Sequence, residues 1–121
     1  MSHVGKTLRQ LITDETKFCR GKPACDVNGN EVLDIRGDEA IAWCLVGGVF
    51  AIHANEDFHG KNVLLAKLTT TIRELYPAYD NGFGIISNFS DNAPWKCINR
   101  VIDIVSSKEG ATASEDVLQP N

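Results

Sequence analysis

The sequence predicts a mainly α-helical, single-domain protein of about four helices, with a small β-hairpin between the first and second helices. Three observations support this fold class. Apolar residues recur with helical spacing in several segments, and an Asn28-Gly29 pair stands between two short runs that suit strands. The chain has 121 residues, 43% of them apolar, which suits one hydrophobic core. We place the folded domain at residues 1–108.

The first predicted helix begins at Val4 and ends near Glu15 or Thr16. Four apolar residues have the spacing of one helix face: Val4, Leu8, Leu11 and Ile12. Gly21, Pro23 and the Asn-Gly pair then interrupt helical structure. Since Asn-Gly is the strongest short-range signal for a tight hairpin turn, we predict strands at 24–27 and 30–33.

The second predicted helix spans about 38–54 and contains the most apolar stretch of the chain, AWCLVGGVFAI. The apolar run from Ala40 to Ala54 has fifteen residues, fewer than the roughly 20 that a membrane-spanning helix needs. Gly47 and Gly48 lack the preceding strand and the Lys-Ser/Thr of a phosphate-binding loop. We therefore expect a core helix whose glycines allow other helices to approach closely.

The third predicted helix covers about 61–76 and ends at Pro77. The next segment is predicted to be a loop, with one short helical turn at 85–88. The last helix starts near Pro94 and carries apolar residues at helical spacing as far as Ser107. Residues 109–121 are small, polar and acidic, and we expect them to be a disordered tail.

The distribution of charge argues against nucleic-acid binding. The formal net charge is -4, and residues 26–60 contain one basic and seven acidic residues. No cluster of Lys and Arg alternates with aromatic residues, as phosphate-binding surfaces require. The N-terminus lacks the apolar segment of a secretory signal, and we expect the four cysteines to be reduced. These features predict a cytoplasmic protein that binds neither nucleic acid nor a membrane.

We predict no metal and no cofactor. Two thiols and two imidazoles have the right chemistry for tetrahedral zinc: Cys19, Cys25, His53 and His59. Five residues separate the members of each pair, whereas the cysteines of common zinc sites are two to four residues apart. The run DVNGNEVLD begins like a calcium loop, but Glu31 and Gly37 stand where Gly and Glu are required.

Several short motifs resemble, in order and spacing, a family of small uncharacterised bacterial and phage proteins that is known only as a domain of unknown function. The resemblance covers residues 4–108 and lies in FCRGKPACDVNGNEV, EAIAWCLVGGVFAIHA and ISNFSDNAPWKCINRVIDIV. The matching positions are Phe18, Gly21, Asp26, Gly29, Trp43, Cys44, Gly47 and Asp91. This chain has Gly48-Val49 where the family has Ala-Leu, and Phe89-Ser90 where it has Trp-Asn. The resemblance implies a mostly helical fold and no particular activity.

The sequence favours a small protein-interaction or accessory module, encoded by a phage or prophage, whose partner is a host protein or a second copy. No nucleophile, base and oxyanion donor can be grouped from the sequence, so we do not predict an enzyme. The acidic segment would attract a basic partner. The candidate interaction residues are Glu31, Asp34, Phe89, Asp91 and Trp95.

An alternative hypothesis is a small enzyme or ligand-binding protein with a site near Asp91, Trp95 and Trp43. Asp91 also has a simpler interpretation, because Ser, Asp and Asn residues before a helix commonly cap its free N–H groups. Capping of the last helix is the prediction that we favour for Asp91.

Overall fold

The helices form where apolar side chains recur every three or four residues, and these side chains meet in one core. The computed structural model of the chain describes residues 3–82 and 84–115. In these ranges the helices are α1 (Leu8–Leu11), α2 (Leu45–Ile52), α3 (Phe58–Leu75), α4 (Ile85–Asn92) and α5 (Trp95–Glu115). The strands are β1 (Ala24–Cys25) and β2 (Ala42–Trp43), and 3₁₀ turns span Glu15–Lys17 and Pro77–Tyr79.

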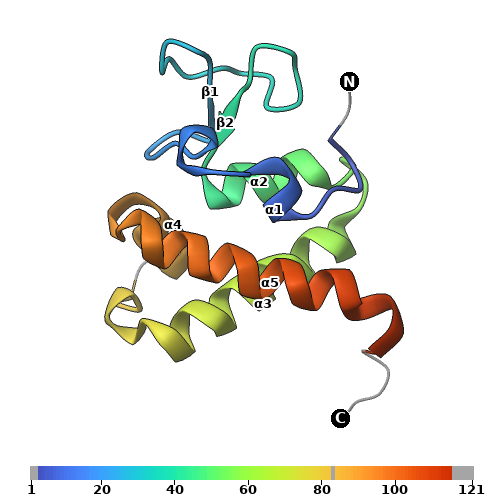
Figure 1. Cartoon of the computed structure of the whole chain (residues 1–121), viewed down its shortest axis with the longest axis vertical. Helices are drawn as coiled ribbons and strands as arrows, with labels where there is room; N and C mark the ends of the chain where they lie inside the picture. Colours follow the sequence, from blue (N-terminus) through green and yellow to red (C-terminus); the bar gives the residue numbers. More distant parts are fainter. Residues whose placement is uncertain (1–2, 83, 116–121) are drawn as a thin grey trace.

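The fold class is confirmed: the protein is mainly helical, with a small antiparallel sheet between α1 and α2. The long helices α3 and α5 pack together, and α1, α2 and the sheet lie on one side of them (Figure 1). Helix α4 packs against both α2 and α3. None of the helices in the described ranges has the length and apolar character needed to cross a membrane.

The second helix is shorter than predicted. We expected a helix over 38–54, but α2 begins only at Leu45, and Ala42–Trp43 form a strand. Cys44 is the N-cap of α2, and its thiol accepts a hydrogen bond of 3.3 Å from the Gly47 N–H. The backbone at the start of the predicted helix makes hydrogen bonds with another segment, because the Cys44 N–H donates to the Pro23 carbonyl at 3.2 Å. Tertiary pairing thus overrides the helical pattern of the sequence.

The predicted turn at Asn28-Gly29 is confirmed, but the predicted pairing of strands 24–27 and 30–33 is wrong, because β1 pairs mainly with β2. The Asp26 Oδ1 accepts hydrogen bonds of 2.9 Å from the N–H groups of Asn28 and Asn30, and Gly29 has a φ of +83°. Strand β1 pairs with β2, placing Ala24 opposite Trp43, whereas residues 30–33 form only bridging contacts with β1. Pairing with β2 buries the Trp43 ring, which explains why that partner is preferred.

The first helix breaks earlier than its apolar pattern predicts. Helix α1 ends at Leu11, and a separate 3₁₀ turn follows at Glu15–Lys17. The Asp14 side chain accepts a hydrogen bond of 2.9 Å from the Thr16 N–H and so starts this new turn. Asp and Thr commonly compete with helix formation in this way.

The C-terminal half contains more helix than predicted. The expected loop with a turn at 85–88 is the two-turn helix α4, because the buried Phe89 ring packs between Tyr76 and Tyr79 with centroid distances of 5.4 and 5.2 Å. Helix α5 continues to Glu115, beyond the predicted end near Ser107. The expected tail over 109–121 thus falls partly in this helix, and residues 116–121 lie outside the described ranges.

The two adjacent glycines of α2 allow two different close contacts. A Cβ atom on Gly48 would lie 2.9 Å from the Leu8 Cδ2, so this glycine lies at a close helix contact as predicted, and the neighbouring helix is α1. A Cβ atom on Gly47 would lie 1.9 Å from the Pro23 carbonyl oxygen. Helix α2 is therefore held against the main chain of the loop before β1, and this contact shapes the pocket described next.

Candidate functional site

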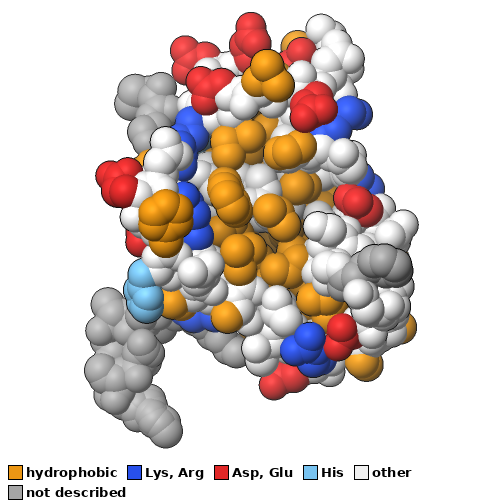
Figure 2. Space-filling model, turned by 180° about the vertical axis from the view of Figure 1, so that it is seen from behind, with side chains coloured by type: hydrophobic (Ala, Val, Ile, Leu, Met, Phe, Trp, Pro, Cys, Tyr) orange, Lys and Arg blue, Asp and Glu red, His pale blue; other side chains and the backbone are white. Residues whose placement is uncertain are grey.

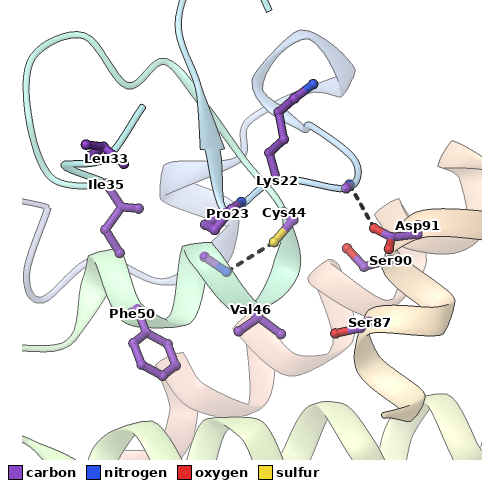
Figure 3. Close-up of a pocket in the computed structure, with 12 residues that line it drawn as sticks. Lys22, Pro23, Leu33, Ile35, Cys44, Val46, Phe50, Ser87, Ser90 and Asp91 are labelled. Atoms are coloured by element: carbon purple, nitrogen blue, oxygen red, sulfur yellow. Dashed lines mark hydrogen bonds between the residues drawn. The ribbon is translucent and has the colours of Figure 1, made fainter. Parts of the chain in front are cut away.

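An open and mainly apolar pocket of about 530 Å³ lies between α2, α4 and the loops on either side of β1. Figure 3 shows its two contrasting walls. The lining residues are Gly21, Lys22, Pro23, Leu33, Ile35, Cys44, Val46, Gly47, Phe50, Ser87, Ser90 and Asp91.

The apolar wall comes from α2 and from the loop after the Asn-Gly turn. Val46 and Phe50 are four residues apart and share one face of α2. Leu33 and Ile35 lie two residues apart in the loop and complete this wall (Figure 3). Leu33 is 96% exposed and Phe50 is 40% exposed, and a broad apolar surface is visible on this side of the molecule (Figure 2).

Arg36 fixes the loop that carries Leu33 and Ile35. Its Nη2 donates a 2.6 Å hydrogen bond to the Phe50 carbonyl and another to the His53 carbonyl, at the C-terminal end of α2. A cation is favoured there by the helix dipole and by carbonyls that lack helical partners. The Trp43 indole N–H also donates to the Ile35 carbonyl at 2.8 Å. On the other side of Leu33, the Val32 N–H donates to the Ala24 carbonyl at 3.1 Å, so the exposed Leu33 projects from a loop that is anchored on both sides.

The polar wall consists of Ser87, Ser90 and Asp91 on α4. The Asp91 Oδ1 accepts a hydrogen bond of 2.9 Å from the Gly21 N–H, and the Ser90 Oγ accepts one of 3.2 Å from the Leu45 N–H. These bonds tie α4 to the loop before β1 and to the first turn of α2. The two hydrogen bonds therefore fix the position of the polar wall relative to the apolar wall.

The predicted capping role of Asp91 is wrong. Asp91 lies inside α4, and its carboxylate is bonded to Gly21 rather than to the last helix. Helix α5 begins two residues after Ala93, and the Pro94 carbonyl accepts the N–H groups of Cys97 and Ile98 at 3.0 and 3.1 Å. Because Ser90, Asp91 and Asn92 belong to α4, none of them occupies the N-cap position of α5.

The surroundings of Cys44 favour the protonated thiol over the thiolate. Burial raises the pKa of Cys44, and the Asp91 carboxylate raises it further, against the opposing effect of the Gly47 and Val46 N–H groups. A raised thiol pKa leaves the side chain protonated and weakly nucleophilic at neutral pH. Among the described lining residues there is no histidine to act as a base for Cys44 or a serine.

A second cavity, of about 510 Å³, carries a strong negative charge and adjoins the first. It is lined by five acidic residues: Asp26, Glu31, Asp34, Asp38 and Glu39. Leu33 lines both cavities. No Lys or Arg is found among the described residues that line the acidic cavity. In Figure 2, acidic side chains gather at the end of the apolar surface where the loops between β1 and β2 lie.

The structure separates the other candidate residues. Glu31, Asp34 and Asp91 are exposed, whereas the Phe89 side chain is wholly buried and cannot contact a partner. Trp95 is half-buried and packs on Phe18 with a centroid distance of 5.7 Å. Neither tryptophan lines the pocket that contains Asp91.

The structure does not gather the four residues weighed as zinc ligands into one group. In the part of the chain that the structure describes, no group of three or more His, Cys, Asp or Glu is placed to hold a metal ion. His53 is the C-cap of α2 and its Nδ1 lies 3.1 Å from the Asp57 Oδ2, while His59 lies in the first turn of α3. Cys19 lies beside Cys25, and burial and this neighbouring thiol raise the pKa of Cys19.

Sequence reasoning missed the apolar half of the site because it assigned apolar residues to the core. Val46 and Phe50 lie on the outward face of α2. Because this helix is apolar on all sides, its sequence does not show which face points outward. Leu33 had a usable signal. It follows Val32, and successive side chains of an extended segment point to opposite sides, so one of the two had to face outward.

Comparison of the chain with known protein families, with curated proteins and with solved structures finds no match. The pocket and the adjoining acidic cavity are therefore the observations from which a function is inferred.

Proposed function

We propose that this protein is a small interaction module that holds a segment of a partner protein in its apolar pocket. One observation supports this proposal above the others: Leu33 and Phe50 remain exposed at the rim of an apolar pocket of about 530 Å³. Exposed apolar surface around a concavity commonly marks an interaction site. The resemblance to small bacterial and phage proteins is compatible with such an accessory role.

The geometry favours binding because the apolar wall is already in place. Arg36 and the Trp43 indole anchor the loop that carries Leu33, which reduces the ordering that a partner must impose. Complete burial of one large apolar side chain contributes about 1.5–3 kcal/mol. A partner that covers Leu33, Phe50 and the pocket between them would therefore gain a useful share of its binding free energy from apolar burial.

A small apolar ligand is the second candidate occupant, since the volume of the pocket falls within the range of about 300–1,000 Å³ typical of ligand sites. Its polar wall, formed by Ser87, Ser90 and Asp91, would orient such a ligand. The exposed position of Leu33 favours a protein segment, because a ligand enclosed within the pocket would leave this side chain in water.

Selection from a display library of random short peptides tests the proposal. The wild-type protein should enrich peptides with clustered apolar residues, and these should bind at least about tenfold more weakly to Leu33→Ser, whose apolar contact is lost. Val27→Ser is the matched control, because Val27 is 78% exposed in the neighbouring Asn-Gly turn and lines neither cavity. Circular dichroism should show that both variants keep the fold.

Two results would contradict the proposal. The first is a failure of the wild-type protein to enrich any peptide family. The second is equal binding of the selected peptides to wild type, Leu33→Ser and Val27→Ser. Saturation of a pocket by small apolar compounds, with no peptide enrichment, would favour the second candidate.

A further inference from the structure

We propose that the segment held in the pocket belongs to a different protein and carries Lys or Arg residues on one side of its apolar anchors. This inference rests on the proposed function and names the chemistry of the partner. It is carried by the position of Leu33, which lines both the apolar pocket and the acidic cavity. A chain that covers Leu33 from the pocket side reaches the carboxylates next.

The acidic cavity presents a concentrated charge of one sign. Glu31, Asp34 and Glu39 are exposed, and the described residues that line this cavity include no Lys or Arg. Hydrogen bonds within the loop do not remove this charge. The Asp34 Oδ1 accepts the Arg36 N–H at 3.1 Å, and such a bond from a neutral amide leaves a carboxylate negative.

The charge is confined to one end of the surface. At the other end, the pocket is lined by Lys22 and Asp91, which have opposite signs. The electrostatic field therefore differs between the Leu33 end and the α4 end of the pocket. Basic residues next to the apolar anchor that covers Leu33 therefore strengthen the binding of a segment. Basic residues at the α4 end strengthen its binding little.

The same charges disfavour other occupants. A phosphate-rich nucleic acid or an anionic membrane would be repelled by the carboxylates around Leu33. In a two-fold symmetric dimer the same surface patch meets itself, so a second copy would bring Glu31 and Asp34 toward their counterparts. Like charges in apposition oppose such a dimer. A basic segment of another protein satisfies both the apolar pocket and the acidic cavity.

Three peptide display libraries test the inference. All share the same randomised apolar core, and they differ only in a flanking run of Lys, Ser or Glu. Selected on wild-type protein at low salt, the Lys library should yield binders at least about tenfold tighter than those of the Ser library, with the Glu library weakest. The advantage of Lys should fade with salt, because the screening length falls from about 30 Å at 0.01 M to about 3 Å at 1 M.

A matched pair of triple variants identifies the surface responsible. Glu31→Gln, Asp34→Asn and Glu39→Gln together should weaken the best Lys-flanked peptide at least about tenfold and leave the best Ser-flanked peptide unchanged. The Asn side chain at position 34 keeps an oxygen that can accept the Arg36 N–H. The control combines Glu15→Gln, Glu56→Gln and Glu74→Gln, which alters net charge equally at residues that line neither cavity.

The outcomes separate this inference from the function on which it rests. Equal affinities from the three libraries, or a preference for the Glu flank, would overturn the basic-partner inference while peptide binding itself stands. An equal effect of the two triple variants would also overturn it. Binders from none of the libraries would overturn both the inference and the proposed function.

Discussion

The Asp91 Oδ1 accepts a hydrogen bond of 2.9 Å from the backbone N–H of Gly21, a residue seventy positions earlier in the chain. The bond joins α4 to the loop before β1 on the polar side of the pocket. Beside it, the Arg20 Nη1 donates to the Ser90 carbonyl at 3.0 Å. Side chains and backbone from both segments thus fix the separation between the two walls.

Replacing Asp91 by Ala should destabilise the protein modestly, because the Gly21 N–H loses its carboxylate partner. We expect a decrease of about 0.5–1.5 kcal/mol in the free energy of unfolding, since this bond lies at the surface. Asp91→Asn should lose less, because its amide oxygen can still accept the bond. Urea unfolding checks both values, and equal losses in the two variants would argue against this role of Asp91.

The two glycines of α2 should respond differently to the same substitution. Gly47→Ala places a Cβ against the Pro23 main chain, which cannot move aside as a side chain does, so we expect a loss above the roughly 1–3 kcal/mol typical of overpacking. Gly48→Ala meets only the flexible end of Leu8 and gains about 1 kcal/mol of helix propensity, so its net effect should be small. Gly48→Leu should overpack the same contact and destabilise clearly.

Thermal and urea unfolding of these variants tests both predicted glycine contacts. A Gly47→Ala protein as stable as wild type would contradict the close contact with Pro23. A Gly48→Leu protein as stable as wild type would mean that Gly48 does not face α1.

The Cys44 thiol should react slowly with iodoacetamide at pH 7. Burial raises its pKa above the ordinary value of 9.0, so little thiolate is present at neutral pH. The rate should rise steeply only above pH 9, and mass spectrometry of tryptic peptides can follow this cysteine separately from the other three. Asp91→Asn should speed alkylation, because it removes a negative charge that raises the pKa. Rapid alkylation of wild type at pH 7 would contradict the placement of this thiol.

Asp57 should make the stability of the fold depend on pH in the acid range. The Gly60 N–H, bonded to the Asp57 Oδ1 at 2.9 Å, and the His53 ring lower the pKa of this carboxyl from 3.8. A lowered pKa in the folded state stabilises the fold above pH 3.8, and that contribution disappears as the pH falls through the folded-state pKa.

The variant Asp57→Ala should therefore lower the melting temperature at pH 7 and have a smaller effect near pH 3. Melting curves of wild type and variant across this range provide the measurement. An effect that is independent of pH would mean that the loss does not come from the ionised Asp57 carboxylate.

The long helices were predictable because their signals are local and repeated. Helix α3 has apolar residues at helical spacing from Leu64 to Leu75 and ends shortly before Pro77. Helix α5 begins directly after Pro94 and also carries apolar residues at helical spacing. The start of α2 was not predictable in this way. The pairing of Ala42 and Trp43 with β1 depends on hydrogen bonds to residues almost twenty positions away, which apolar periodicity does not encode.

The acidic half of the candidate site was visible in the sequence, because Glu31 and Asp34 belong to a segment rich in acidic residues. The apolar half was not, since Val46 and Phe50 have the same character as the buried residues beside them. Their exposure follows from where α1 and the loop before β1 pack on α2. The Asp91 contact with Gly21 similarly exists only once the chain has folded.

The contact between Gly47 and Pro23 separates what can change in this pocket from what cannot. Gly47 and Pro23 both line the pocket, and at this point the wall consists of main-chain atoms. Replacing side chains elsewhere in the pocket does not move these atoms. Leu33, Ile35, Val46 and Phe50 line the same pocket with their side chains, so replacing them would change its surface without moving that main chain. The shape and chemistry of this surface can therefore be altered at these four positions while the backbone that frames the pocket stays the same.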